Sequence, residues 1–411
     1  DEMGIQGGVE NLHWVFTGTF VVMLLAVPLF GWAVARLGRR KLLVTTYGFF
    51  AFNLAVFFLL FRSGVATEWV ARAFFIWVSV FNLFVVSVFW SVMTDVFSNA
   101  QARRLFGVIA AGGSAGAILG PGLTAVLSPM LGPINLIPLS IIFLVLAACC
   151  GLAVMRLASV THGLSSGPTN RPANKSGDAA GGKSGIQGGV WSGATRVLRS
   201  RYLLGICLFI LLYTSLSTFL YFEQARIVES AFVDSGRRTQ VFALIDLVVN
   251  LLTVGAQFFV TARLITWFGL PLTLALIPLL TAIGFIALGV APILAVLVVF
   301  QVVRRAGNYA IARPAREMLF TVVAREDKYK SKNFIDTVVY RGGDAVSGWA
   351  FAGLASLGFG LSAIAFIAVP LAGAWMVTAW FLGLHQEKLR ENLREHSDKS
   401  TSIKNASNRR E

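Results

Sequence analysis

Residues 14–61 read WVFTGTFVVMLLAVPLFGWAVARLGRRKLLVTTYGFFAFNLAVFFLLF, and this stretch decides the fold. It holds two apolar runs, 14–35 and 42–61, joined by the short basic turn ARLGRRK. Each run reaches the roughly 20 residues that a helix needs to cross about 30 Å of hydrocarbon. The stretch therefore predicts two membrane-spanning helices with a charged turn at one membrane surface.

The same alternation of apolar run and loop continues along the whole chain. The eleven predicted spans are 14–35, 42–61, 70–94, 105–130, 133–155, 202–224, 240–262, 270–290, 292–314, 333–357 and 361–384. Hydrophobic residues make up 56% of the 411 residues, charged residues only 13%, and the mean hydropathy is +0.72. A soluble protein of this length has no need of so much apolar surface, so the composition predicts an all-α integral membrane protein.

The basic residues predict the orientation. Of the 35 Lys and Arg residues, 27 fall in every second loop, in the central linker or in the C-terminal tail. Positive charge concentrates on the cytoplasmic side, so we expect the linker and the C-terminus in the cytoplasm of a cell whose inner (plasma) membrane holds the protein. Orientation alone accounts for the net charge of +15, so no nucleic-acid partner is predicted.

An odd number of spans then places the observed N-terminus on the outer side. Residues 1–13 agree, because they contain three acidic residues and no Lys or Arg. The chain also begins with Asp1 and not with Met. We expect a twelve-helix protein whose first helix is missing from this sequence.

A break in composition divides the spans into two groups. Residues 158–200 are rich in Gly, Ser, Asn and Pro, which is typical of a flexible linker. We therefore predict an N-terminal bundle over 1–157, a cytoplasmic linker over 158–200, a six-helix C-terminal bundle over 201–384 and a basic cytoplasmic tail over 385–411. Two six-helix halves joined by a long cytoplasmic loop are typical of one large class of secondary transporter.

The turn between the first two spans carries a local signature. It reads Gly31-Trp-Ala-Val-Ala-Arg36-Leu-Gly38-Arg39-Arg40-Lys. It resembles the loop motif between helices 2 and 3 of the major facilitator superfamily, and this resemblance implies a two-bundle fold with a gating role for these residues. Ala35 stands where that motif carries Asp, which puts in doubt the charge lock that the carboxylate normally forms.

The fourth span contains small residues at every fourth position: Gly112, Gly116 and Gly120. This spacing gives a helix one smooth ridge on which a neighbouring backbone can approach closely. We expect a tightly packed helix at the interface between the two halves.

Polar residues inside the spans predict a substrate path. Charged groups at lipid depth are costly and by default mark pathways or ion pairs. The candidate binding residues are Tyr213 in the sixth span, Asn250 in the seventh, Arg304, Arg305, Asn308 and Tyr309 in the ninth, and Tyr340 and Arg341 in the tenth. Two guanidinium groups beside tyrosines and an amide could grip a phosphate or carboxylate. Internal salt bridges that only stabilise the bundle are the alternative.

Carboxylates in or near the spans are candidates for coupling to a proton. They are Asp95 at the end of the third span, Asp246 in the seventh, and Asp336 and Asp344 in the tenth. The same groups could instead be the salt-bridge partners of the arginines. Gly342 and Gly343, beside Arg341, predict a bend or break in the tenth helix.

Two segments resemble a narrower family, the ATP/ADP (nucleotide) translocases. One runs from Trp90-Ser-Val-Met-Thr-Asp95 through Arg103-Arg104 to Gly112-Gly113-Ser114; the other, from Tyr309 to Asp344, holds Ala-Arg316-Glu-Met, a Lys-rich loop and Ile335-Asp336. The resemblance implies a nucleotide-like substrate and basic binding residues at Arg103, Arg316, Lys332 and Arg341. Arg316 stands where that family has Lys, and Asp95 where it often has Asn.

These observations lead us to expect a secondary active transporter that moves a small organic anion, with nucleotide-like solutes the leading class, by alternating access. We expect no cofactor, no metal and no enzymatic activity, since the spans hold no histidine and the chain no Walker motif. Two alternatives stay open. One is a proton-coupled exporter of an amphipathic or cationic compound, and the other is a non-transporting membrane receptor or scaffold.

Overall fold

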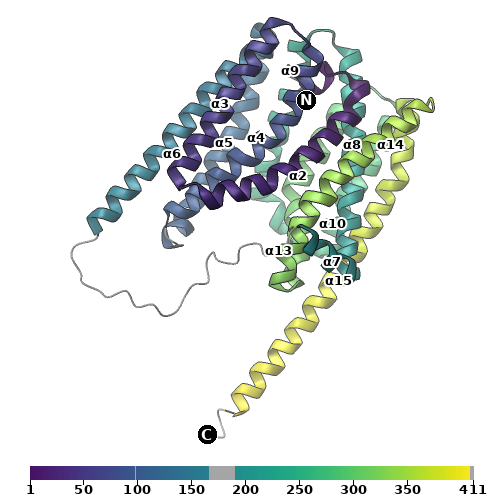
Figure 1. Ribbon diagram of the computed structural model, residues 1–411. Coiled ribbons are helices and arrows are strands. Elements are labelled where there is room, and N and C mark those ends of the chain that lie inside the picture. Colours follow the sequence, from purple (N-terminus) through teal and green to yellow (C-terminus); the bar gives the residue numbers. More distant parts are fainter. Residues whose placement is uncertain (98, 166–189, 408–411) are drawn as a thin grey trace. The chain divides into compact units, whose positions relative to one another are not determined.

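The computed structural model describes residues 1–97, 99–165 and 190–407, which form helices joined by short turns and contain no strand (Figure 1). The chain divides into two compact units. Unit 1 comprises Asp1–Gly189 and Val233–Ala243, and unit 2 comprises Val190–Phe232 and Leu244–Glu411. Most of the predicted linker, residues 166–189, lies outside the described residues.

Unit 1 is built from long helices with two short helical turns between them. Its elements are α1 (Glu2–Gln6), η1 (Val9–Asn11), α2 (Leu12–Arg36), α3 (Arg39–Ser63), α4 (Thr67–Val96), α5 (Asn99–Leu131), η2 (Ile134–Leu136), α6 (Ile137–Ser165) and the first residues of α9 (Ser235–Phe259). Helix α3 packs against both α4 and α6.

Aromatic side chains fill the core of unit 1. The ring of Phe50 in α3 contacts those of Trp77, Phe81 and Phe84 in α4 edge to face, at centroid distances of 5.6, 5.4 and 5.9 Å. Such edge-to-face pairs stabilise a core beyond the area that they bury. Leucine, valine and methionine side chains complete this cluster.

Unit 2 is also helical, but two of its helices are interrupted by π-helical turns. Its elements are α7 (Val190–Arg199), α8 (Arg201–Ala231), the rest of α9, α10 (Thr261–Val290), α11 (Leu294–Gly307), η3 (Asn308–Ala312), α12 (Arg313–Leu319), η4 (Phe320–Val322), α13 (Arg325–Phe334), η5 (Ile335–Val339), α14 (Tyr340–Ser356) and α15 (Leu361–Ser407). The π-helical turns are η3 and η5. Helix α8 packs against α14 and α15, and α10 against α15.

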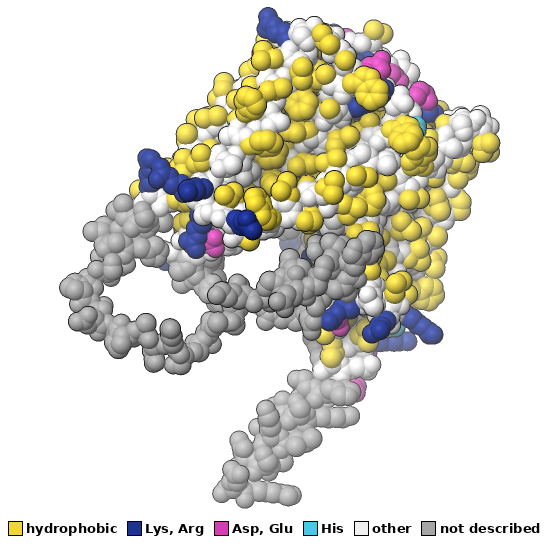
Figure 2. All heavy atoms as spheres, viewed as in Figure 1, with side chains coloured by type: hydrophobic (Ala, Val, Ile, Leu, Met, Phe, Trp, Pro, Cys, Tyr) yellow, Lys and Arg dark blue, Asp and Glu magenta, His cyan; other side chains and the backbone are white. Residues whose placement is uncertain are grey.

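Ten helices of the described part of the chain are long and apolar enough to cross a membrane. Apolar side chains dominate the surface seen in Figure 2, as lipid contact requires. The tenth predicted span, 333–357, is not among the ten, and it carries the charged residues Asp336, Arg341 and Asp344. The structure forms it from the π-helical turn η5 at Ile335–Val339 followed by α14, an interruption that apolar length alone does not predict.

Two further features follow from local sequence. Gly269 has φ 72° and ψ 175°, a backbone conformation that favours glycine, and this kink separates the first turns of α10 from its apolar part. Helix α15 instead runs without a break from the last predicted span into the basic tail, as far as Ser407. The tail region is thus helical for most of its length.

Candidate functional site

The most polar interior in the described chain lies in unit 2, where α8 meets α11 and α14. Helix α8 is apolar over most of its length, yet it buries Thr214, Thr218, Glu223 and Gln224. Polar groups removed from water must find hydrogen bonds or they destabilise the fold. The partners of these side chains therefore define the site.

Arg304 is the central residue. It lies in α11, about 15 Å from the start of that helix at 1.5 Å per residue, and is only 6% exposed. Its Nη1 donates to Ser217 Oγ at 3.3 Å and its Nη2 to Gln301 Oε1 at 3.2 Å, while its Nε has no partner. Gln301 Nε2 in turn donates to Gln224 Oε1. Within the described residues, this guanidinium group has neutral partners only.

The adjacent Arg305 is neutralised. Its Nη2 lies 2.7 Å from Asp246 Oδ1 in α9, and the two side chains are 25% and 35% exposed. Asn250, one turn further along α9, donates from Nδ2 to the backbone oxygen of Asp246 at 2.9 Å. Of these two neighbouring arginines, Arg305 therefore has a counter-ion, and Arg304 has none among the described residues.

Tyrosines and an amide extend the network beyond Arg304. Asn308 Nδ2 donates to the Tyr213 hydroxyl at 3.0 Å, and the rings of Tyr213 and Tyr340 are 6.0 Å apart. Asn308 begins η3 and Tyr340 directly follows η5. Single π-helical turns inside α-helices occur frequently at functional sites. Tyr309 interacts with Arg305 and lies under the guanidinium group of Arg313, at 5.1 Å.

Helix α14 brings a carboxylate to the same part of α8. Thr218 Oγ1 donates to Asp344 Oδ1 at 3.1 Å, and Arg341 Nη1 lies 3.9 Å from Asp344 Oδ2. A side chain at Gly343 would overlap Thr214 Oγ1, so glycine is required for this close approach of the two helices. The Arg341–Asp344 pair therefore belongs to the wall beside Tyr340.

Asp336 lies in a separate charged cluster. Arg316 Nη2 is 3.8 Å from Asp336 Oδ1 and 3.9 Å from Glu317 Oε1, and Lys332 Nζ is 2.6 Å from Glu317 Oε2. These residues belong to α12, α13 and η5. Of the four basic residues suggested by the translocase resemblance, Arg316 and Lys332 fall here and Arg341 falls beside Asp344, while the side chain of Arg103 lies outside the described part.

The predicted gating motif lies in unit 1. Arg39 Nε is 3.0 Å from Asp95 Oδ2, and its Nη1 donates to the Asp95 backbone oxygen at 3.1 Å. These side chains are 60% and 44% exposed, so Asp95 is an ion-pair partner at a helix end. The guanidinium group of Arg36 lies 5.4 Å from the centre of the Trp32 ring, Gly38 precedes α3, and Gly31 and Arg40 lie in α2 and α3.

The predicted packing ridge lies on α5 in unit 1. A Cβ added at Gly112, Gly116 or Gly120 would meet nothing within 4 Å. The three glycines are exposed within the described residues. The packing of this ridge at the interface between the two halves stays a prediction.

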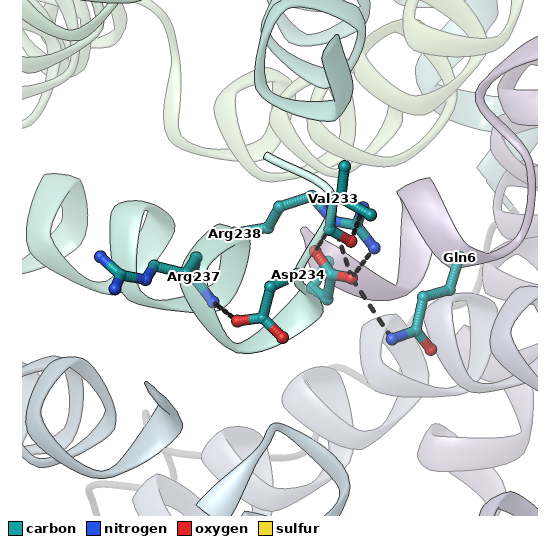
Figure 3. A network of polar contacts seen from close by, with 6 residues as sticks. Gln6, Val233, Asp234, Arg237 and Arg238 are labelled. Atoms are coloured by element: carbon teal, nitrogen blue, oxygen red, sulfur yellow. Dashed lines mark hydrogen bonds and ion pairs between the residues drawn. The ribbon is translucent and has the colours of Figure 1, made fainter. Parts of the chain in front are cut away.

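A buried ion pair lies at the start of the chain, in unit 1 (Figure 3). Arg238 Nη2 lies 2.8 Å from Glu2 Oε1, and its Nε donates to the Glu2 oxygens at 3.1 and 3.0 Å. Gln6 Nε2 adds a hydrogen bond to Glu2 Oε1 at 3.3 Å. The first residues of α9 are thereby fixed to α1.

The sequence pattern missed two buried polar residues of unit 2. Gln301 lies three residues before Arg304 on the same face of α11, so its spacing could have identified it. Glu223 is fully buried in α8, near the end of the sixth predicted span. Nothing in the apolar pattern around Glu223 distinguishes a buried carboxyl from one that reaches water.

Together, the membrane-spanning helices and the buried polar network define a multi-pass membrane protein of the transport class. The comparison with protein families agrees. The family described as Major Facilitator Superfamily matches residues 5–312, which is more than half of the chain. The chain belongs to the major facilitator superfamily and is a secondary transporter, not an enzyme.

A solved structure supports the fold. The structure titled "Crystal structure of auto inhibited POT family peptide transporter" is similar with a TM-score of 0.58 and 16% sequence identity, over 92% of this chain and 88% of that one. No curated protein matches the sequence. Neither match names a nucleotide translocase, so that resemblance stays a prediction.

Proposed function

We propose that this transporter moves a small organic anion across the inner membrane by alternating access, and that Arg304 is the residue that binds the anion. The observation that carries the proposal is the buried guanidinium group of Arg304, whose partners among the described residues are all neutral. An arginine at the centre of a membrane helix costs about 2.5–3.5 kcal/mol on insertion scales. A bound anion would offset that cost.

The distribution of charge favours an anion over an internal salt bridge. Asp246 is held by Arg305 at 2.7 Å, and Asp344 by Thr218 and Arg341. Neither carboxylate contacts Arg304. The guanidinium group has planar geometry that suits bidentate binding of a carboxylate or phosphate, and Asn308 and Tyr340 lie along the same network.

Our proposal also names two classes of anion that this site could bind. The similarity of Tyr309–Asp344 to nucleotide translocases favours a nucleotide-like solute. The peptide transporter that shares the fold raises a second class, because a peptide also carries a carboxylate. Both contain a group that Arg304 can bind, so the experiment has to separate them.

The orientation is also part of the proposal. The bias of basic residues places α7 and the end of α15 in the cytoplasm and the turn between α3 and α4 outside. Each side of the membrane then has an exposed position for labelling: Lys388 on the cytoplasmic side and Val65 on the outer side. With Cys149, Cys150 and Cys207 replaced, a cysteine at position 65 should react with an impermeant maleimide in intact cells and one at 388 only after lysis. The reverse pattern would overturn the orientation.

Uptake into proteoliposomes tests the substrate class. Radiolabelled ATP, succinate, dialanine and the cation tetraphenylphosphonium would each be offered with and without a pH gradient. We expect uptake of one of the anions, reduced about 30-fold or more by Arg304→Gln, since truncating a desolvated charge contact costs 2–5 kcal/mol. The matched control is Arg263→Gln, which replaces an exposed arginine of α10.

Two results would contradict the proposal. One is uptake of an anion that Arg304→Gln leaves unchanged. The other is uptake of tetraphenylphosphonium alone, which would favour the export of cationic compounds through Asp246 or Asp344.

A further inference from the structure

Glu223 stands out among the buried groups that the proposed anion site does not use. Its side chain is 0% exposed, and neither of its carboxyl oxygens has a hydrogen-bond partner among the described residues. It lies in α8, eight residues before the helix ends at Ala231, or about 12 Å from that end. An ionised carboxylate in such a place, without partner or water, is among the most costly arrangements in a protein.

The charged groups nearest in the fold are engaged elsewhere. On α8 itself, Arg226 is three residues further along, and its guanidinium group lies 5.2 Å from the centre of the Phe351 ring. On α14, Arg341 and Asp344 face each other and Thr218, and on α11 Arg304 faces Ser217 and Gln301.

The other elements that pack against α8 add no charge beside Glu223. The buried side chains of α15 that lie along the bundle are Ile364, Ala365, Ala368, Ala372, Trp375 and Ala379. Asp336 of η5 is held by Arg316, and the charges of α7 lie near Arg201, about 33 Å along α8 from Glu223. Within the part of the chain that the structure describes, the Glu223 carboxyl group is thus enclosed without a counter-charge.

We propose that Glu223 is a proton-binding site of the transport cycle. The enclosed carboxyl group carries a proton in this conformation. When this end of α8 opens, the O–H bond breaks, the proton passes to water, and the carboxylate that remains can pair with Arg226 at i+3. The next residue, Gln224, accepts a hydrogen bond from Gln301, which in turn accepts one from Arg304. A movement of α8 at Glu223 would therefore also move the hydrogen-bonded residues of the anion site. The coupling to substrate rests on the proposed anion transport, whereas the bound proton does not.

Infrared spectroscopy of the purified protein in lipid nanodiscs at neutral pH tests the bound proton without any substrate. The difference spectrum between the wild type and Glu223→Gln should show loss of the carbonyl stretching band of a protonated carboxylic acid. The control is Glu229→Gln, which removes an exposed glutamate of the same helix. There, only carboxylate bands should be lost, because water solvates that charge.

The result that overturns the proposal is loss of carboxylate bands alone in Glu223→Gln. A failure of Glu223→Gln to fold would also overturn it, since an amide and a protonated carboxyl group have nearly the same shape and charge. The expected melting temperature is that of the wild type.

The coupling is tested on whichever of ATP, succinate or dialanine the wild type takes up. One coupled proton allows about tenfold accumulation per pH unit, and Glu223→Gln should lose this accumulation while it retains exchange of labelled for unlabelled probe. Gradient-driven accumulation that survives in Glu223→Gln would refute coupling through this residue. The uptake measured for Arg304→Gln, by contrast, tests the anion site alone and not the proton bound at Glu223.

Discussion

The two units of this transporter share an all-helical construction but differ in what they bury. Among the described residues of unit 1, the buried polar and charged side chains are Glu2, Thr19, Thr46 and Ser128. Those of unit 2 are Thr214, Thr218, Glu223, Gln224, Thr273, Thr281, Gln301, Arg304, Asn308, Ser331, Ser347 and Gln386. Since buried polar groups destabilise a fold unless they are satisfied, their concentration in unit 2 points to function and not to packing.

The polar contacts of the two units also differ in kind. In unit 1 they join helix ends, as with Arg39 and Asp95 or Glu2 and Arg238, around a core of aromatic rings. In unit 2 the polar contacts lie between helices inside the bundle, from Ser217 in α8 to Gln301 in α11. Substitutions in unit 1 should therefore alter stability, whereas substitutions in unit 2 should alter transport.

The largest effect on stability is expected at the aromatic core of unit 1. Phe50→Ala removes a buried ring and leaves a cavity, which should cost about 3–5 kcal/mol of unfolding free energy. Thermal unfolding in detergent measures the loss, with the exposed Phe52→Ala of the same helix as control. Transport per folded molecule should stay at the wild-type value. A Phe50 variant of normal stability but impaired transport would contradict the assignment of stability to the core of unit 1 and of transport to unit 2.

Breaking the Arg305–Asp246 pair should have the next largest effect. Arg305→Met leaves the carboxylate of Asp246 without its partner, which should cost about 3 kcal/mol, at the low end for buried pairs because both groups are partly exposed. The double variant with Asp246→Met should regain most of the lost melting temperature. If the double variant is less stable than either single one, the pair is not the interaction that stabilises this place.

A smaller effect is expected at Gln301. Gln301→Leu removes the partner of both Arg304 and Gln224 and should cost about 1–2 kcal/mol. It should also reduce uptake of the anion, because the guanidinium group loses the contact that orients it. Gln257→Leu, at an exposed position in α9, is the control. Equal uptake in the two variants would show that Gln301 does not position Arg304.

The smallest effect is expected at Arg39. Its pair with Asp95 is exposed to solvent, so Arg39→Gln should change the unfolding free energy by less than about 1 kcal/mol. The difference in unfolding free energy between Arg39→Gln and the wild type should shrink further in high salt. A loss of several kcal/mol that is insensitive to salt would mean that the loop motif stabilises unit 1 far more than its geometry indicates.

Much of this arrangement could be predicted from the sequence. Hydrophobic length predicted the spans, and ten helices of the described chain are long and apolar enough to be such spans. The charged residues within the predicted spans included Arg304, which the structure buries. The partners could not be predicted, because helical spacing states which residues share a face but not which helix that face meets. Hence Arg304 and Arg305 were expected to act as a pair, whereas the structure gives a carboxylate to Arg305 only.

The tenth span shows a second limit of sequence reasoning. Gly342 and Gly343 predicted a bend or break at that point, but α14 is helical through both residues, and the π-helical turn lies earlier, at Ile335–Val339. The residues in and after this turn contact other helices: Asp336 contacts Arg316 of α12, and Tyr340 contacts Tyr213 of α8. Local propensity carries no information about such contacts.

The central claim is that Arg304 is a buried charge without a counter-ion, kept for binding an anion. The melting temperature of Arg304→Gln without substrate tests it most directly, because removing an uncompensated charge relieves the cost of its burial. We predict that the empty variant melts at or above the temperature of the wild type and gains no stability from the transported anion, which stabilises the wild type. A fall of several degrees in the empty variant, with stabilisation by the anion intact, would contradict the account.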